Sequence, residues 1–395
     1  MPKTTLLTDK RTDIAKQRSL YEPIKLSKEQ AFDKQKIITE LQSKGLQLFS
    51  DETGASGRRG GAGPSDHKAV TIGETTVMVP VYTGGAAQSP YGVECDRTTG
   101  ESFLTKSGQP IFPIAFPQQP KFYGLQTADG IPYSKIALLH SKDVLATTVL
   151  QTCIRYENRK TACQFCAIGQ SLQDNRTIAK KTPEQLAEVA EAAVRLDGIR
   201  NIIMTTGTPN TTDRGAAYLT ECAQAIRARV SVPMQAQCEP PDDFAWFEKM
   251  KAAGVDTLGM HLEAADPAVR AKIMPGKARV SLSYYFEAFA AAVKVFGRGQ
   301  VNTYLLAGLG DSKETLISVS RKLIDIGVYP FVVPFVPIVG TPLAYHAPPD
   351  SEFMFDLYQA IGALLREANL LSSEIKAGCA KCGACSALSN FEGKF

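Results

Sequence analysis

The pattern of hydrophobic positions changes near residue 136. From residue 145 to residue 368, short apolar runs rich in β-branched residues alternate with segments in which apolar residues recur every three or four positions. The first pattern is typical of buried strands and the second of amphipathic helices. About six strand–helix units follow one another, which predicts an α/β fold with a parallel sheet and crossover helices. Six units fit a partial barrel or an open sheet, and periodicity does not choose between them.

The boundaries of these units carry local signals. Thr182 precedes Pro183 and Gln185, which predicts a capped helix start, and Gly198 predicts its end. The predicted strands are 145–150, 199–206, 230–237, 255–262, 301–306 and 331–336, and the later predicted helices are 215–229, 242–253, 282–296, 312–326 and 351–368.

The amino-terminal part of the chain has a different pattern. Ser27 and Gln30 form a capping-box signal for a helix that Gly45 would end, and residues 46–49 alternate like a short strand. Short β runs broken by Pro and Gly then continue to residue 133. The expected organisation is an arm and helix (1–45), a small β-rich domain (46–135), an α/β core (136–350), and a helix with a cysteine-rich tail (351–395).

A glycine-rich segment, GASGRRGGAG at residues 54–63, lies before this β-rich region. Backbone N–H groups in such a loop can bind phosphate, and a surface or lid loop is the alternative. The segment does not match the P-loop pattern.

Charge and composition exclude several classes of partner. Lys and Arg number 44 and Asp and Glu 40, so the net charge of +4 gives no reason to expect nucleic acid or an anionic membrane. Neither an apolar run of about 20 residues nor a signal peptide is visible. These features predict a cytoplasmic protein. In a reducing compartment, nine cysteines point to metal or redox chemistry rather than to disulfides.

Three cysteines follow the first predicted strand of the core. Cys153, Cys163 and Cys166, here called the rim cysteines, lie on a loop just past the carboxyl end of the strand, where α/β barrels place their chemistry. Thiolates at such spacings bind an iron–sulfur cluster or zinc, and zinc would need a fourth ligand.

Three more cysteines, Cys379, Cys382 and Cys385, stand two residues apart in the tail. These tail cysteines predict a metal site without naming the metal. A second iron–sulfur cluster is favoured, zinc with a fourth ligand from Cys238, a histidine or a substrate is the alternative, and a mobile redox or unliganded segment is also open. His140 is interpreted as a structural histidine or, alternatively, as a ligand or proton carrier.

The loops after the other strands complete a polar, glycine-lined rim. His261 and Glu263 share one face of the fourth strand if alternation continues along it. His261 would then be a proton or hydrogen-path residue beside Glu263, and a core histidine is equally open. For Glu263, the alternative to a cofactor contact is an ion pair with a nearby cation. The remaining rim segments are 205–209, 306–311 and 336–342.

With these motifs in place, residues 145–345 resemble the radical S-adenosylmethionine (SAM) enzymes, near the biotin synthase and lipoyl synthase branch. Cys163-Gln-Phe165-Cys166 is similar to the paired cysteines of that family, with an aromatic residue before the last. The resemblance implies a partial (β/α)6 barrel of radical SAM type. It assigns cofactor contacts to Phe165, Thr206, Gly207, Thr208, Glu263, Gly308 and Gly310, and residues 338–343 resemble the sixth-strand loop of biotin-synthase-like members.

One spacing departs from the family. Nine residues separate Cys153 from Cys163, where the family has three. The insert either bulges away and leaves the thiolates convergent, which we favour, or Cys153 is not the first ligand. The wide spacing resembles a subfamily associated with nitrilase-type gene clusters. Arg155, Arg159 and Lys160 in the insert fit a solvated charged loop, or alternatively groups that tune the cluster.

The resemblance also implies a function. The rim cysteines would hold a [4Fe–4S] cluster whose open iron binds SAM, and reductive cleavage would give a 5′-deoxyadenosyl radical that abstracts hydrogen from a small-molecule substrate. An electron donor such as flavodoxin or ferredoxin is then needed. The alternative function is a non-catalytic iron–sulfur protein that carries electrons or clusters.

Overall fold

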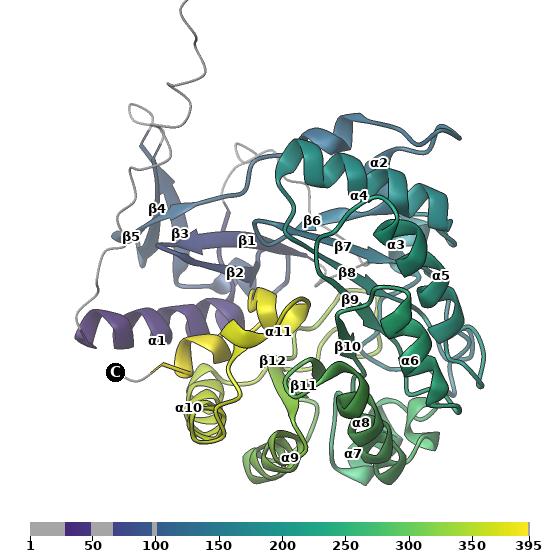
Figure 1. Cartoon of the computed structure of the whole chain (residues 1–395). Coiled ribbons are helices and arrows are strands. Elements are labelled where there is room, and N and C mark those ends of the chain that lie inside the picture. The colour runs from purple at the N-terminus through teal and green to yellow at the C-terminus, as the bar shows by residue number, and fades with distance from the viewer. Residues whose placement is uncertain (1–27, 49–65, 97–100, 394–395) are drawn as a thin grey trace, which may run out of the picture.

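A computed structural model describes residues 28–48, 66–96 and 101–393, and it contains two sheets (Figure 1). A five-stranded antiparallel sheet lies beside a seven-stranded, mostly parallel sheet. One hydrophobic core joins them, with Val79 and Tyr91 from the first sheet and Leu258 and Val332 from the second. The smaller sheet is therefore packed against the larger one rather than tethered to it.

The smaller sheet has the order β2-β1-β5-β4-β3 and is preceded by helix α1, Lys28–Lys44, which packs on β2. Gly45 ends this helix with φ +78°, as predicted. The predicted strand at 46–49 is wrong for residues 46–48, because they make single backbone hydrogen bonds to Pro80 and Tyr91 instead of a ladder. The predicted arm and the glycine-rich loop lie outside the described residues. The strands are β1 His67–Ile72, β2 Thr75–Pro80, β3 Tyr91–Cys95, β4 Ser102–Lys106 and β5 Gln109–Ala115.

The larger sheet confirms the predicted partial barrel. Strands β7 to β12 are parallel and pair in the order of the sequence, and β6 adds one antiparallel strand at the β7 edge. Strands β6 and β12 form the two edges, so the curled sheet is a half-barrel that does not close. The strands are β6 Leu138–His140, β7 Val144–Thr148, β8 Asn201–Thr205, β9 Met234–Gln237, β10 Thr257–Gly259, β11 Val301–Ala307 and β12 Val328–Pro334.

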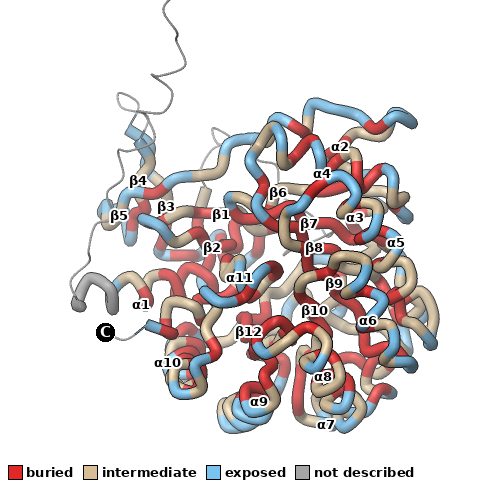
Figure 2. The backbone as a smooth tube through the Cα atoms, in the orientation of Figure 1, coloured by how far each residue is buried: buried red, intermediate tan, exposed pale blue. Residues whose placement is uncertain are grey.

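Long helices cover the outside of this half-barrel (Figure 1). The strands are buried, whereas the helices expose the side that faces away from the sheet (Figure 2). Thr182 and Gln185 form the predicted capping box at the start of α4, and Gly198 ends that helix in the left-handed conformation. The covering helices are α4 Pro183–Asp197, α5 Ala216–Arg227, α6 Ala245–Ala252, α8 Leu282–Phe296, α9 Lys313–Asp325 and α10 Ser351–Glu367.

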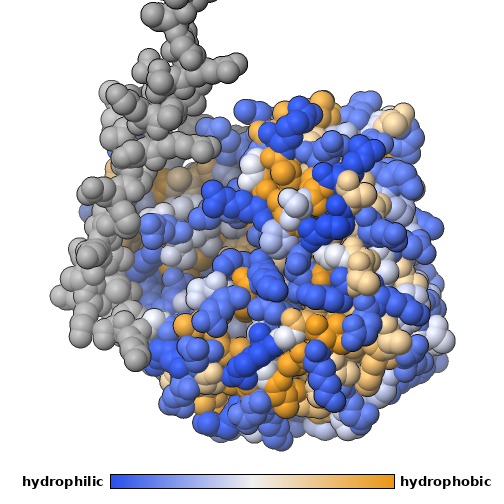
Figure 3. Space-filling view, viewed as in Figure 1, coloured by the Kyte–Doolittle hydropathy of each residue, from blue (hydrophilic) through white to orange (hydrophobic). Residues whose placement is uncertain are grey.

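Short helices occur mainly in the loops. The α-helical ones are α2 Tyr133–Ile136, α3 Gln170–Gln173, α7 Pro267–Ile273 and α11 Cys379–Cys382, and 3-10 turns lie at Ala86–Gln88, Lys121–Gly124, Lys277–Arg279, Ser372–Glu374 and Leu388–Phe391. The face drawn in Figure 3 is mostly hydrophilic, with hydrophobic residues in separate groups. Within the described ranges, no helix is both long enough and apolar enough to cross a membrane.

Candidate active site

The rim cysteines lie on the loop between β7 and α3, at the carboxyl ends of the parallel strands. The nine-residue insert folds into turns, in which Tyr156 N–H donates to the Cys153 carbonyl (2.9 Å) and Thr161 N–H to the Asn158 carbonyl (2.9 Å). The insert thus bulges, and Cys166 remains close enough to Cys153 for the two to interact electrostatically. Neighbouring loops fix this position, because Ile154 N–H donates to the Thr208 carbonyl (2.9 Å) and Gln164 N–H to the Ile273 carbonyl (2.8 Å).

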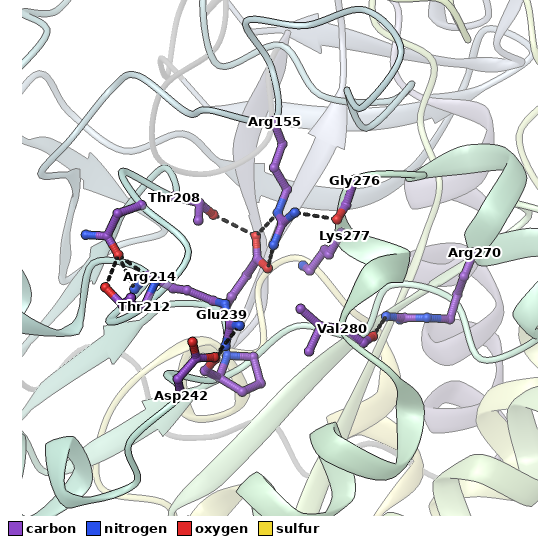
Figure 4. A network of polar contacts seen from close by, with 12 residues as sticks. Arg155, Thr208, Thr212, Arg214, Glu239, Asp242, Arg270, Gly276, Lys277 and Val280 are labelled. Atoms are coloured by element: carbon purple, nitrogen blue, oxygen red, sulfur yellow. Dashed lines mark hydrogen bonds and ion pairs between the residues drawn. The ribbon is translucent and has the colours of Figure 1, made fainter.

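A buried ion pair joins the insert to the loop after β9 (Figure 4). Arg155 Nε and Nη2 each donate to Glu239 over 2.6 Å, and both side chains are less than a tenth exposed. Arg155 also donates to the Gly276 carbonyl, and the Thr208 hydroxyl donates to Glu239 (2.6 Å). Burial alone would raise the pKa of Glu239, but these donors hold it below its ordinary value. Arg155 is therefore a buried anchor, not the solvated residue predicted, whereas Arg159 and Lys160 are exposed.

Gly207 allows two strand ends to come together. Its N–H donates to the Leu150 carbonyl (2.8 Å), and a Cβ on it would lie 2.0 Å from the Thr152 carbonyl oxygen. Real Cβ atoms do not approach backbone so closely. Gly207 thus places the β8 loop directly against the residue before Cys153.

Replacing this glycine is expected to displace the cysteine loop. Gly207→Ala should lower the free energy of unfolding by about 1–3 kcal/mol, because backbone must move to accept the methyl group, and it should reduce iron bound after reconstitution. Urea unfolding and iron analysis measure the two effects. Gly84→Ala is the matched control, since nothing lies within 4 Å of a Cβ there. Equal iron and stability in the two variants would contradict this account.

A second buried ion pair stands beside the rim cysteines. Lys277 Nζ donates to both oxygens of Glu263, over 2.7 and 2.6 Å. Burial tends to lower the pKa of Lys277, but Glu263 raises it above its ordinary value, so the ammonium group stays charged at neutral pH. The alternative considered for Glu263, an ion pair with a nearby cation, is present in the structure.

The backbone at Glu263 is unusual. Glu263 has φ +59°, follows the short strand β10 and makes an isolated bridge to Leu305. Few non-glycine residues adopt this conformation, and such residues gather at functional sites. Simple strand alternation therefore stops before Glu263. His261 instead accepts from Tyr304 N–H through Nδ1 (3.3 Å), and burial, with Lys277 nearby, lowers its pKa to about 3.

The remaining predicted contact residues divide into two groups. The Thr206 hydroxyl bonds within its own turn, to the Gly207 carbonyl (2.8 Å), and stays partly exposed at the rim. Gly308 and Gly310, with φ +104° and +130°, need glycine for their backbone conformation. A Cβ on Gly308 would lie 2.8 Å from Pro349, so protein atoms occupy the space beside this glycine.

Phe165 lines a cavity of about 230 Å³ between the half-barrel and the smaller sheet with α1. Most of the lining is apolar, with Met78, Leu306 and Phe335 among its side chains. Cys385 of the tail also lines it. The cavity therefore connects the rim cysteine loop with the tail cysteines.

The tail cysteines lie at the opposite, amino-terminal ends of the strands. Cys379 N–H donates to Gln235 Oε1 on β9 (3.2 Å), and Thr257, the first residue of β10, donates to the Ala377 carbonyl (3.2 Å). In Figure 1 the tail, with α11, lies between the smaller sheet and the strands of the half-barrel. The two cysteine groups thus face each other across the barrel interior.

Comparison with known proteins identifies the core. Residues 158–323 match the model of the radical SAM superfamily. This part of the core is thus similar to the radical SAM superfamily. Among curated proteins, bacteriochlorophyllide c C-7(1)-hydroxylase of Chlorobaculum limnaeum is 28% identical over 256 residues, which are 60% of this chain. The match spans 63% of the length of that relative, just under two thirds.

Two solved structures give weaker likenesses. Methylornithine synthase (PylB) has a TM-score of 0.46 and 18% identity, over 62% of this chain and 69% of its own. A radical SAM methyltransferase from Sphaerobacter thermophilus has a TM-score of 0.44 and 15% identity, over 75% of this chain and 81% of its own.

The radical SAM superfamily implies a [4Fe–4S] cluster and SAM, and the rim cysteines have the right donor chemistry for the cluster. In the described ranges, no three His, Cys, Asp or Glu side chains gather tightly enough to hold a single metal ion. Zinc would need a fourth protein ligand here, whereas a cubane held by three cysteines leaves one iron open for SAM.

Sequence patterns missed two residues of the site. Glu239 follows β9, the one strand end for which no rim residue was predicted, and Lys277 lies far from any motif. A carboxylate directly after Gln237-Cys238 at a strand end was a usable signal for Glu239. Nothing local marked Lys277, since its role comes from the fold of the α7–α8 loop.

Proposed function

We propose that this protein is an enzyme that reductively cleaves SAM and uses the resulting radical to abstract hydrogen from a small molecule. The observation that carries the proposal is the convergence of Cys153, Cys163 and Cys166 at the strand ends of a radical SAM core, beside the buried Lys277–Glu263 pair. Bound by these thiolates, a reduced [4Fe–4S] cluster would supply the electron that splits the sulfonium of SAM.

The chain's own residues would orient SAM. We assign Thr206 to the amino group, because its hydroxyl is partly exposed, whereas Thr208 is committed to Glu239. Glu263 is assigned to the ribose hydroxyls, since a carboxylate has about four acceptor positions and Lys277 uses two. Gly308 and Gly310 are assigned to the adenine of SAM, by the resemblance of residues 308–310 to the fifth-strand glycines of the family, and Phe165, which lines the cavity, would separate SAM from it.

The cavity supports a small, mainly apolar substrate. Its walls offer few polar groups, so the substrate would be held by burial and shape, with Tyr304 and Gln42 as polar contacts. Exclusion of water there would protect a radical from side reactions.

The donor of electrons would approach the cysteine loop. Arg159 and Lys160 are exposed there against one exposed carboxylate, Glu157, which suits an acidic carrier such as flavodoxin or ferredoxin. A reducing cytoplasm agrees with nine free cysteines. We also propose that the protein lies near the biotin synthase and lipoyl synthase branch, in a subfamily associated with nitrilase-type gene clusters. The domain bounds that we propose are those predicted from the sequence.

The tail cysteines are proposed to bind a second metal centre, either a cluster or zinc. Cys385 supports it, because this tail cysteine lines the cavity that Phe165 of the rim loop also lines.

The test is SAM cleavage by the anaerobically reconstituted and reduced full chain. We expect 5′-deoxyadenosine and methionine in equal amounts, and tight SAM binding that perturbs the electron paramagnetic resonance (EPR) signal of the reduced cluster. Neither cleavage nor binding, in protein with its full complement of iron, would overturn the proposal.

A further inference from the structure

We propose that His140 is the fourth ligand of the tail site, and that Cys379, Cys382, Cys385 and His140 together hold an iron–sulfur cluster. This inference rests on the second metal centre proposed above and names its ligands, its metal and its position. His140 Nε2 lies 3.5 Å from Cys385 Sγ. The two residues are 245 positions apart in sequence, so only the fold brings them together.

The other fourth ligand considered from the sequence, Cys238, has different surroundings. It is buried after β9, and its electrostatic neighbours are Glu239, Asp213 and Arg214, with none of the tail cysteines among them. Cys238 therefore belongs to the rim side of the barrel. The sequence also left open an unspecified histidine, and His140 at the end of β6 is in contact with Cys385 of the tail.

The tail loop is held in a fixed shape before any metal binds. Met78 N–H donates to the Ala384 carbonyl (2.7 Å), and Gln42 Nε2 donates to the same oxygen (3.1 Å). Gly378 has φ +93°, and the Gln235 side chain fills the space where a Cβ would point. The backbone is thus fixed from both the smaller sheet and the half-barrel, as a preorganised ligand set requires.

Hydrogen-bond donors surround the sulfurs. Gln237 Nε2 donates to Cys379 Sγ over 3.1 Å, and the Tyr304 hydroxyl donates to the same sulfur. Ser141, next to His140, donates to Cys382. Such donors stabilise thiolates and tune the potential of the clusters they ligate.

The donors to sulfur favour a cluster over structural zinc, because hydrogen bonds to ligating sulfurs tune the potential of a redox centre. Phe165 of the rim loop and Cys385 of the tail line the same cavity, so a cluster here would border the chamber proposed for the substrate.

The test uses a background that lacks the rim site, Cys163→Ala/Cys166→Ala. After anaerobic reconstitution this protein should retain about four irons and four sulfides per chain, and adding Cys382→Ala should remove them. Adding Cys95→Ala is the matched control and should change nothing, because Cys95 is exposed on β3. One zinc and no iron in the background protein would overturn the cluster.

The histidine is tested separately by pulsed EPR of the reduced background protein. We expect a nitrogen coupling that disappears in His140→Cys while the iron content is kept. An unchanged coupling in His140→Cys would overturn the assignment of His140. Circular dichroism checks the fold, and His140→Cys keeps a ligand in place where alanine would empty the site. SAM cleavage is measured in the wild-type chain, so failure of the proposed function and failure of this inference are separate results.

Discussion

Cys163→Ala/Cys166→Ala is expected to abolish 5′-deoxyadenosine formation, down to the background of the assay. The variant removes two of three thiolates from the rim loop, and a single remaining cysteine cannot hold a cubane. Iron content should fall by about four per chain, and SAM should no longer perturb the EPR signal. The measurement is product analysis by chromatography alongside iron and sulfide analysis.

Cys95→Ala controls for the loss of a thiol as such, because Cys95 lies on β3, away from both cysteine groups. Its iron content and SAM cleavage should equal those of the wild type. Full SAM cleavage by Cys163→Ala/Cys166→Ala would mean that the rim cysteines do not hold the reactive cluster.

Arg155→Met is expected to lower the free energy of unfolding by about 3–5 kcal/mol, since it leaves the Glu239 carboxylate buried and without its main partner. The Arg155–Glu239 pair is bidentate and less than a tenth exposed. Loss of the pair should also release the insert and reduce iron binding at the rim. Urea unfolding of the apoprotein and iron analysis after reconstitution provide the two measurements.

The matched control is an exposed ion pair of similar length. Arg229 donates to Glu191 over 2.9 Å, with both side chains about half exposed, so Arg229→Met should cost less than about 1 kcal/mol. The double variant Arg155→Met/Glu239→Leu should recover most of the stability, because a buried pair replaced by apolar side chains is often neutral. If Arg155→Met were as stable as Arg229→Met, the anchor described for the cysteine loop would be wrong.

The architecture was predictable because it depends on local patterns. Strand–helix alternation and the capping box at Thr182 need only neighbouring residues, and both are confirmed. The short edge strand β6 was not predicted, because three residues carry too little periodicity. The predicted strand at residues 46–49 failed for a related reason, since alternation over a few residues does not provide a pairing partner.

The site was predictable only in part. Cysteine spacing identifies the rim and tail groups, but their positions at opposite ends of the barrel depend on long-range packing. Alternation along the fourth strand placed His261 and Glu263 on one face, yet the positive φ of Glu263 turns the backbone out of the strand. Lys277 illustrates the general limit, because a buried ion pair between distant loops has no sequence signature.

The contact between the tail and the smaller sheet has a consequence for how the chain reaches its native state. Gln35 Nε2 donates to the Asn390 carbonyl, 355 residues away, and Gln42 and Met78 both bind Ala384. Contacts between residues so far apart in sequence slow folding, because long loops must close before the contacts form. During synthesis, the face of the smaller sheet that receives the tail stays uncovered until the tail has been made, because Ala384 follows Gln42 by 342 residues, and chaperones would have to protect it for that time.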